Sequence, residues 1–226
     1  MLQPGDGAKR LLETGLYRLR FSESELQSQR AVWVEICRFL QPYVEASGET
    51  LDLGAGYCHF INAIQSKRKY ALDLNPENLD RFAAPGVEKI VASGSAIPGL
   101  ADASIQTVFA SNVYEHFPSR EEVAASIGEV HRLLRAGGRF IILQPNFAHC
   151  MKEYFDFFDH RLAFTHRAMV EAVENGGFKV QRVISRFLPY TSKSGLPKAP
   201  WLVRFYLSVP LAWQVLGGQF LIVCQK

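Results

Sequence analysis

Residues 50–60, Thr-Leu-Asp-Leu-Gly-Ala-Gly-Tyr-Cys-His-Phe, decide the fold of this chain. A short apolar run meets an acidic residue and two closely spaced glycines, and the start of an amphipathic helix follows. This order predicts a strand, a tight turn and a helix N-terminus, where backbone N–H groups can approach a ligand. Asp73 closes the next apolar run 73 − 52 = 21 positions after Asp52, which lies in the expected turn. A carboxylate at that distance is suited to accept hydrogen bonds from ribose hydroxyls.

The same stretch has to be compared with a dinucleotide-binding turn. A Gly-x-Gly-x-x-Gly pattern that starts at Gly54 needs a glycine at position 59, where this chain has His59. Asp52 would also repel a pyrophosphate. A ligand with a ribose, a cationic centre and an amino group suits Asp52 better, so the turn favours S-adenosylmethionine over NAD.

The composition is that of a globular domain. The chain has 226 residues, of which 48% are hydrophobic and 21% charged, and its net charge is +3. One domain with a full core is therefore expected. The sequence has no dense Lys/Arg run, so it gives no support for a nucleic-acid partner. It also has no apolar run long enough to span a bilayer and no basic-then-apolar leader, which predicts a cytoplasmic protein.

The four cysteines are widely scattered, at Cys37, Cys58, Cys150 and Cys224. They form no Cys-x-x-Cys pair, so the sequence predicts free thiols in a reducing compartment. We expect neither a disulfide framework nor a metal centre.

Short apolar runs alternate with helical patterns over most of the chain, which predicts a parallel sheet covered on both faces. Strands are expected near 50–53, 69–73, 88–92, 105–110, 138–144, 178–184 and 219–224. Helices are expected near 22–41, 58–66, 76–83, 119–135, 165–175 and 201–216, the last one broken at Pro210. The helix near 119–135 has the clearest signals, because a capping box opens it at Ser119 and Gly137-Gly138 is expected to close it.

Four strand-end segments carry suitable chemistry for one ligand. In an open parallel sheet, ligands bind outside the carboxyl ends of the strands. We therefore expect one crevice to be bordered by Asp52–Gly56, Asp73-Leu74, Gly94–Ile97 and Ser111–His116.

Together these stretches resemble class I S-adenosylmethionine-dependent methyltransferases of the small-molecule branch known as type 11. The resemblance covers roughly residues 48–146 in the usual order of the family's motifs. These motifs are Leu51-Asp-Leu-Gly-Ala-Gly-Tyr57, Ala71-Leu-Asp-Leu-Asn-Pro76, Gly94-Ser-Ala-Ile-Pro98, Ser111-Asn-Val-Tyr-Glu-His116 and His131-Arg-Leu-Leu-Arg-Ala-Gly-Gly-Arg-Phe140 leading to Gln144-Pro-Asn146.

The resemblance implies a doubly wound, mostly parallel, Rossmann-like α/β sheet of seven strands, with an antiparallel C-terminal strand beside the fifth. It implies a single domain over 1–226, with an arm and helix at 1–47, the cofactor core at 48–146 and acceptor-side elements at 147–226. It also implies that the cofactor contacts the following residues: Asp52, Gly54, Ala55 and Gly56 at the methionine part, Asp73 and Leu74 at the ribose, Ser95 and Ala96 at the adenine, and Ser111 and Asn112 under the sulfonium.

The chain departs from the family pattern at two positions. Cys58 stands where the family usually has a third glycine, and Ser95 stands where it usually has an acid that holds the adenine amino group. A small side chain is tolerable at position 58, because no pyrophosphate has to fit there. The contact to adenine is expected to pass to the backbone of Ala96.

The acceptor side is expected from the N-terminal arm with Tyr17–Phe21, from residues 146–160 and from the loop 186–196. His160, beside Asp159 in an aromatic cluster, is the first candidate for a general base, and His149 is the second. A histidine titrates near neutral pH, and a hydroxyl acceptor has to lose a proton. Each histidine is also compatible with a purely structural role. Tyr190 and Lys193 are candidates for contacts to a polar acceptor.

Later segments look like those of bacterial members that act in carbohydrate or cell-surface pathways, so we expect O-methylation of a sugar or glycoconjugate hydroxyl. Three alternatives stay open: N- or C-methylation of another small metabolite, a non-catalytic adenosylmethionine-binding module, and an NAD(P)-dependent oxidoreductase. The apolar segment 201–213 is compatible with a cover on the sheet edge, a homodimer face or a peripheral membrane contact.

Overall fold

The computed structural model describes residues 22–190 and 199–226. The expected arm contact at Tyr17–Phe21, and Lys193 of the expected acceptor loop, lie outside these residues.

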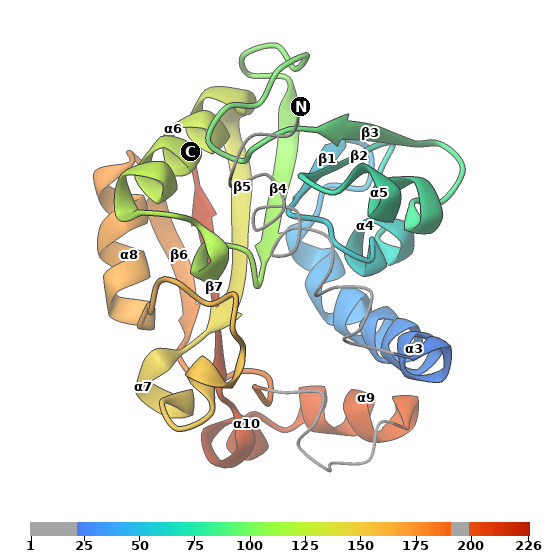
Figure 1. Ribbon diagram of the computed structural model, residues 1–226, viewed down its shortest axis with the longest axis vertical. Coiled ribbons are helices and arrows are strands. Elements are labelled where there is room, and N and C mark those ends of the chain that lie inside the picture. The colour runs from blue at the N-terminus through green and yellow to red at the C-terminus, as the bar shows by residue number, and fades with distance from the viewer. Residues whose placement is uncertain (1–21, 191–198) are drawn as a thin grey trace, which may run out of the picture.

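One seven-stranded sheet organises the molecule, with the strand order β3-β2-β1-β4-β5-β7-β6 (Figure 1). The pairs among the first five strands are parallel, and β7 runs antiparallel to both β5 and β6. This confirms the expected mostly parallel α/β sheet with an antiparallel C-terminal strand beside the fifth. The strands are β1 Glu49–Leu53, β2 Arg68–Asp73, β3 Val87–Val91, β4 Ile105–Ser111, β5 Leu134–Pro145, β6 Lys179–Ile184 and β7 Gln219–Gln225.

The helices lie close to the ranges that the periodicity predicts. The α-helices are α3 Glu23–Leu40, α4 His59–Ala63, α5 Pro76–Phe82, α6 Arg120–Leu133, α7 Phe147–Cys150, α8 His166–Asn175, α9 Pro200–Ser208 and α10 Pro210–Leu216. Short 3-10 turns occupy η2 Gln41–Tyr43, η3 Tyr114–His116 and η4 Tyr154–Asp156. The helix near 58–66 is shorter than expected, and Pro210 starts α10 after a break, as the sequence suggests.

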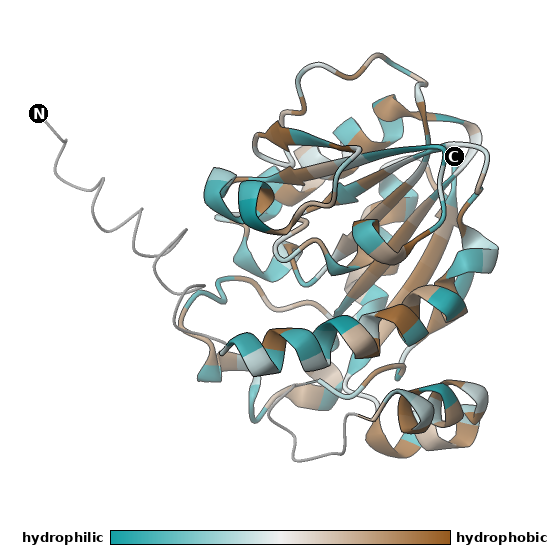
Figure 2. Ribbon diagram, turned by 90° about the vertical axis from the view of Figure 1, so that its right-hand side faces the viewer, coloured by the Kyte–Doolittle hydropathy of each residue, from teal (hydrophilic) through white to brown (hydrophobic). Residues whose placement is uncertain are grey.

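Two hydrophobic layers cover the two faces of the sheet (Figure 1). Alternate residues of each strand point to opposite layers, so that Val108 packs with α6 and α8 while Phe109 packs with α3 and α4. In Figure 2 the strands are largely brown, whereas α3 carries both teal and brown residues along its length. α3 also contacts α9, and the bidentate ion pair between buried Glu35 and Arg204 joins these two helices at 2.9 Å.

The end of the helix near 119–135 was predicted wrongly. Ser119 caps α6 as expected, because its Oγ accepts the N–H of Glu122 at 3.3 Å, but the helix stops at Leu133 and the chain enters β5 at once. Gly137 and Gly138 belong to an irregularity where β5 shifts its register against β4. A Cβ at Gly138 would lie 2.9 Å from the carbonyl oxygen of Arg135 and 3.1 Å from that of Gln106. The glycines therefore serve close backbone packing in the sheet and do not cap a helix.

The turn after β1 is held against the neighbouring strand. The backbone N–H groups of Gly54 and Ala55 both donate to the carbonyl oxygen of Leu72, at 2.8 and 2.9 Å. Gly54 has φ +72°, and a Cβ there would lie 2.4 Å from Cγ2 of Val113. Cys58 adopts φ 56°, so the position where the resemblance calls for glycine does use the left-handed conformation. A non-glycine residue there costs about 1–2 kcal/mol, a strain typical of functional turns.

We predict that Gly54→Ala lowers the free energy of unfolding more than Gly99→Ala does. Both positions have a positive φ, which costs an alanine about 1–2 kcal/mol, but a Cβ added at Gly99 would meet no atom within 4 Å. Only Gly54→Ala adds the collision with Val113, for about a further 1–3 kcal/mol. Urea denaturation measures both values, and adding Val113→Ala should recover part of the loss. Equal losses for the two glycines would contradict the assigned collision.

Candidate functional site

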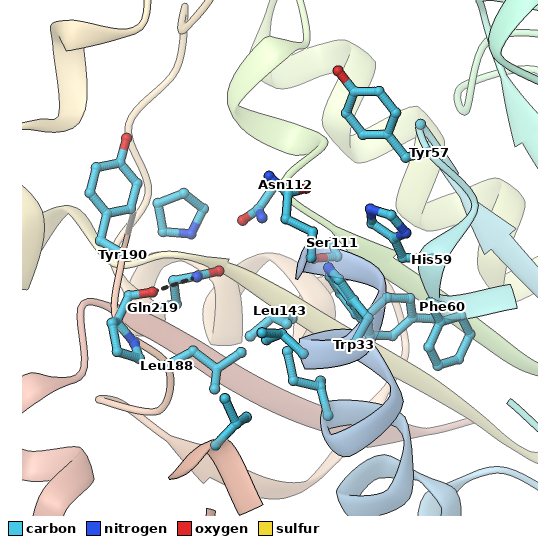
Figure 3. Close-up of a pocket in the computed structure, with 18 of the residues that line it drawn as sticks. Trp33, Tyr57, His59, Phe60, Ser111, Asn112, Leu143, Leu188, Tyr190 and Gln219 are labelled. Atoms are coloured by element: carbon cyan, nitrogen blue, oxygen red, sulfur yellow. Dashed lines mark hydrogen bonds between the residues drawn. The ribbon is translucent and has the colours of Figure 1, made fainter. Parts of the chain in front are cut away.

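A cavity of about 640 Å³ opens at the carboxyl ends of β1 and β4 (Figure 3). Its size falls within the range of small-molecule sites. Its lining comes from the turn after β1, the end of β4, α3, α4, α9 and the 188–190 segment. Figure 3 shows Ser111 and Asn112 between the group Trp33, His59 and Phe60 and the group Leu188, Tyr190 and Gln219. The cavity therefore joins segments from almost the whole described chain.

Six of the predicted cofactor residues line this cavity. They come from β1, from the turn that follows it and from the end of β4, and they are Asp52, Gly54, Ala55, Gly56, Ser111 and Asn112. Asn112 has φ 49°, a conformation that asparagine tolerates better than most residues. The first and fourth strand ends thus meet at one site, as the parallel topology predicts.

Asp52 is a buried acid within β1, whereas the sequence placed it in the turn that follows the strand. Burial raises the pKa of its carboxyl group to about 8, the N–H of Ile61 opposes this shift, and the negative charge of Asp73 adds to it. A cationic group brought into the cavity would favour the ionised form of Asp52. The electrostatics of this end of the cavity therefore suit a ligand that carries positive charge.

Asp73 ends β2 and holds the turns on both sides of it. Its carboxylate accepts the N–H of Gly56 at 2.8 Å and the N–H of Asn75 at 2.9 Å. Burial raises its pKa, and these backbone hydrogen bonds oppose the rise. Each carboxylate oxygen retains acceptor capacity beyond one such bond. Asp73 is therefore positioned beside the turn after β1, although it is outside the set of residues that line the cavity.

The residues expected at the nucleoside end lie at the same edge of the sheet but do not line the cavity. Leu74 is 55% exposed directly after β2. Ser95 follows β3, and its Oγ is 2.8 Å from that of Ser93. Ala96 is exposed beside it. The strand ends thus bring these residues to the expected edge, and their contact to a cofactor stays a prediction.

Three side chains with proton-transfer or ligand chemistry also line the cavity, Glu115, His116 and His160. One ligand atom from each lies within 4.8 Å of those of the other two. The rings of His116 and His160 meet edge to face with centroids 5.1 Å apart, and His160 stacks on Phe157 at the same distance. His160, the first candidate for a base, thus lines the same cavity as the turn after β1.

His149, the second candidate, occupies a different place. It is exposed on α7, its ring stacks with that of His166 at 6.5 Å, and it is not among the residues that line the cavity. Asp159, which the sequence places beside His160, contacts His116: the backbone oxygen of Asp159 is 3.1 Å from Nδ1 of His116, and Oδ2 is 3.5 Å from it.

Sequence reasoning missed the apolar wall of the cavity. It is built from α3, α4, β4, α9 and the 188–190 segment, with Trp33, Phe60, Phe109, Leu188 and Phe205 among its members. The ring of Trp33 meets that of Phe109 edge to face, and Phe60 stacks on Phe109 at 3.8 Å. His59 lies beside Trp33, and burial lowers its pKa to about 4. Its imidazole is therefore neutral at physiological pH. The apolar stripe of α3 predicts burial but cannot tell a cavity wall from a core.

Comparison with known proteins agrees with this geometry. Residues 51–142 match the model of a family described as "Methyltransferase domain". No curated protein matches the chain.

Solved structures of similar fold include a SAM-dependent methyltransferase from Archaeoglobus fulgidus, with TM-score 0.67 and 15% identity, covering 94% of this chain and 98% of that one. A SAM-dependent methyltransferase from Thermotoga maritima has TM-score 0.68 and 14% identity, covering 95% and 99%. A Haloferax volcanii structure, a complex with the methyltransferase activator Trm112, has TM-score 0.67 and 16% identity, covering 93% and 96%.

We predict that Asp73→Asn weakens binding of S-adenosylhomocysteine, the demethylated cofactor, by about 10- to 100-fold, because a charge-assisted hydrogen bond to the ribose is worth about 1.5–3 kcal/mol. Asparagine keeps one oxygen for the N–H of Gly56, which limits the damage to the turn. Calorimetric titration should show a much smaller loss for the 2′-deoxyribose analogue, whose partner hydroxyl is missing. Asp80→Asn, at an acid on α5 that pairs with Lys89, is the control. Equal losses for both ligands would show that Asp73 acts through the turn alone.

Proposed function

We propose that the chain is an S-adenosylmethionine-dependent methyltransferase that methylates a hydroxyl group of a small-molecule acceptor; the match of residues 51–142 to a methyltransferase domain supports this assignment. The observation that carries this proposal is the continuity of one cavity from the Gly54–Gly56 turn to the imidazoles of His116 and His160. The donor is held at the turn, and the acceptor occupies the part of the cavity between the sulfonium and the imidazoles.

The transfer is an in-line displacement. The acceptor oxygen forms a bond to the methyl carbon, the carbon–sulfur bond breaks, and its electron pair returns to sulfur to leave S-adenosylhomocysteine. The methyl group of a sulfonium is already activated, so the protein contributes alignment of the two reactants and exclusion of water. Orientation of this kind accounts for about 7–11 kcal/mol of barrier reduction in well-aligned systems.

The choice of a hydroxyl rests on the Glu115, His116 and His160 cluster. A hydroxyl has to lose its proton as the new bond forms, and a positioned group that handles this proton contributes about a hundredfold or more. A neutral amine attacks through its lone pair and does not require such a group for the attack itself. The cluster lines the cavity, which favours O-methylation over the N- or C-methylation alternatives and over a module that only binds the cofactor.

The apolar wall of the cavity favours one class of acceptor, a glycoconjugate that carries an apolar group. The lining between the donor turn and α9 is mainly aromatic and aliphatic, with Trp33, Phe205 and Leu216 among its residues. A sugar hydroxyl directed at His160 would leave an attached apolar group against this wall.

The exposed apolar side chains of α9 and α10 support peripheral binding of the protein to an anionic membrane. Trp201, Leu211 and Val215 are between 68% and 80% exposed and form what we call the α9–α10 face. After Glu174 the sequence has no Asp or Glu and carries seven basic residues, Lys179, Arg182, Arg186, Lys193, Lys198, Arg204 and Lys226. Exposed apolar side chains on a helix pair, in a stretch of sequence that carries an excess of basic residues, are typical of interfacial binding. Among the described residues, no helix has the length and hydropathy of a membrane span.

We predict that His160→Ala lowers kcat by about a hundredfold or more while the Kd of S-adenosylhomocysteine stays within about twofold of the parent value. The measurement is transfer of labelled methyl groups to a panel of alkyl glycosides, with calorimetry for the cofactor. His149→Ala, at an exposed imidazole outside the cavity lining, is the matched control and should retain activity. Activity of His160→Ala within a few fold of the parent would exclude this residue from the chemistry. Cofactor binding without transfer to any glycoside would contradict the proposed acceptor class.

We predict that the protein sediments with phosphatidylglycerol vesicles and much less with phosphatidylcholine vesicles. The variant Leu211→Glu with Val215→Glu should lose most of this binding, because it places two carboxylates on the α9–α10 face without touching the cavity lining. Its cofactor affinity is the control for folding. Binding that is unaffected by the two glutamates would contradict this assignment, as would dimerisation through the same face in light scattering.

A further inference from the structure

Glu115, His116 and His160 meet although 160 − 116 = 44 positions separate the two imidazoles. Two backbone hydrogen bonds bring the segments together, because the N–H groups of Arg161 and Leu162 both donate to the carbonyl oxygen of Glu115, at 2.8 and 3.1 Å. His160 is thereby fixed next to the turn that carries the other two side chains. Two imidazoles and one carboxylate with ligand atoms within 4.8 Å of one another are spaced as the ligands of one cation can be.

His116 has the hydrogen bonding of a metal-binding histidine. Its Nδ1 is 3.1 Å from the backbone oxygen of Asp159, which can only accept, so Nδ1 carries the proton. The carboxylate of Asp159 lies 3.5 Å from the same nitrogen. Nε2 then keeps its lone pair, and it lies 4.0 Å from Oε1 of Glu115. A metal-ligating histidine usually donates its other N–H to a carbonyl or carboxylate in this way, which fixes the tautomer and the ring orientation.

Glu115 is a preoriented carboxylate, since it is only 1% exposed. With its amide oriented to satisfy its neighbours, Gln144 accepts the N–H groups of Val113 and Tyr114 at 3.1 and 3.0 Å and donates to Oε2 of Glu115. Oε1 faces the side of His116. Burying an ionised carboxylate is costly unless positive charge or hydrogen bonds compensate it, and a divalent cation supplies such a charge. The supporting contacts of Gln144 and Asp159 thus hold two of the three side chains in place.

We propose that Glu115, His116 and His160 bind one divalent first-row transition-metal cation at the acceptor end of the cavity. One carboxylate and two imidazoles suit Mn²⁺, Fe²⁺, Co²⁺ or Zn²⁺ better than Mg²⁺ or Ca²⁺, which prefer oxygen ligands. Three protein ligands leave coordination positions open, and all three residues line the cavity, so these positions face the acceptor. The spacing of the cysteines predicts no metal centre. The proposed site contains no cysteine, so that spacing could not indicate it.

The consequence for the reaction rests on the proposed function. A bound cation lowers the pKa of coordinated water from 15.7 to about 7, and it acidifies a coordinated alcohol in the same way. The acceptor hydroxyl gives its proton to water in the cavity mouth, and the resulting alkoxide oxygen attacks the methyl carbon. His160 then acts as a ligand and not as the proton acceptor. The cation also places the oxygen at a fixed position relative to the donor turn.

Titration of the purified protein with Co²⁺ tests the site directly, because coordinated Co²⁺ shows visible absorption that reports nitrogen and oxygen ligation. We expect one Co²⁺ per chain, and calorimetry with Zn²⁺ and Mn²⁺ should give the same stoichiometry. His160→Ala and Glu115→Gln should each weaken Co²⁺ binding by at least about tenfold. His149→Ala, which removes an exposed imidazole outside the cavity lining, should bind as the parent does. Cofactor affinity and the far-UV circular dichroism spectrum verify folding in each variant.

Two results would overturn the metal site. One is the lack of Co²⁺ absorption in the parent protein, and the other is absorption that survives His160→Ala and is lost in His149→Ala. In either case binding of S-adenosylhomocysteine would still stand, and His160 would keep its predicted role as a base. Loss of cofactor binding in the parent would instead refute the proposed function. The two failures are therefore distinguishable. A metal-loaded protein whose methyl transfer is abolished by a chelator and restored by Mn²⁺ or Zn²⁺ would support both.

Discussion

The attachment of the donor turn to the neighbouring strand is the constraint on which the rest of the structure depends. Gly54 and Ala55 share the carbonyl oxygen of Leu72, and Gly56 donates to the carboxylate of Asp73. These bonds fix the turn after β1 to the end of β2 and require a positive φ at Gly54, against Val113. The turn therefore has its shape before a ligand arrives, and preorganisation of this kind lowers the cost of binding.

The rest of the cavity lining depends on contacts between residues that are distant in the sequence. The backbone oxygen of Glu115 accepts two N–H groups of the 161–162 segment, and this brings His160 to the cavity that the turn after β1 also lines. The ion pair between Glu35 and Arg204 joins α3 to α9, and both helices contribute to the apolar wall. A buried acid, a cluster of two imidazoles with a carboxylate, and an apolar wall thus line one cavity. The proposed methyl transfer to an amphipathic alcohol rests on this combination.

The fold was largely readable from the sequence because its signals are local. Apolar runs that alternate with helical patterns predicted the strands, and Ser119 predicted the start of α6. The glycines at 137–138 misled, because a glycine pair signals a helix end as well as a close backbone approach in a sheet, and only the packing against Gln106 distinguishes the two. The donor turn was predictable for the same local reason. The pairing of Glu115 with His160, and the use of Trp33 as a cavity wall, arise from tertiary contacts that no spacing in the sequence encodes.

The central claim is that one cavity places the donor's sulfur between the turn after β1 and the imidazole of His160. A crystal structure with bound S-adenosylhomocysteine measures this directly. The account predicts the amino acid part of the ligand at Asp52–Gly56, the ribose hydroxyls within hydrogen-bond distance of Asp73, and the sulfur directed past Ser111 and Asn112 towards His160. A nucleoside bound away from Asp73, or a sulfur that faces away from His160, would contradict it.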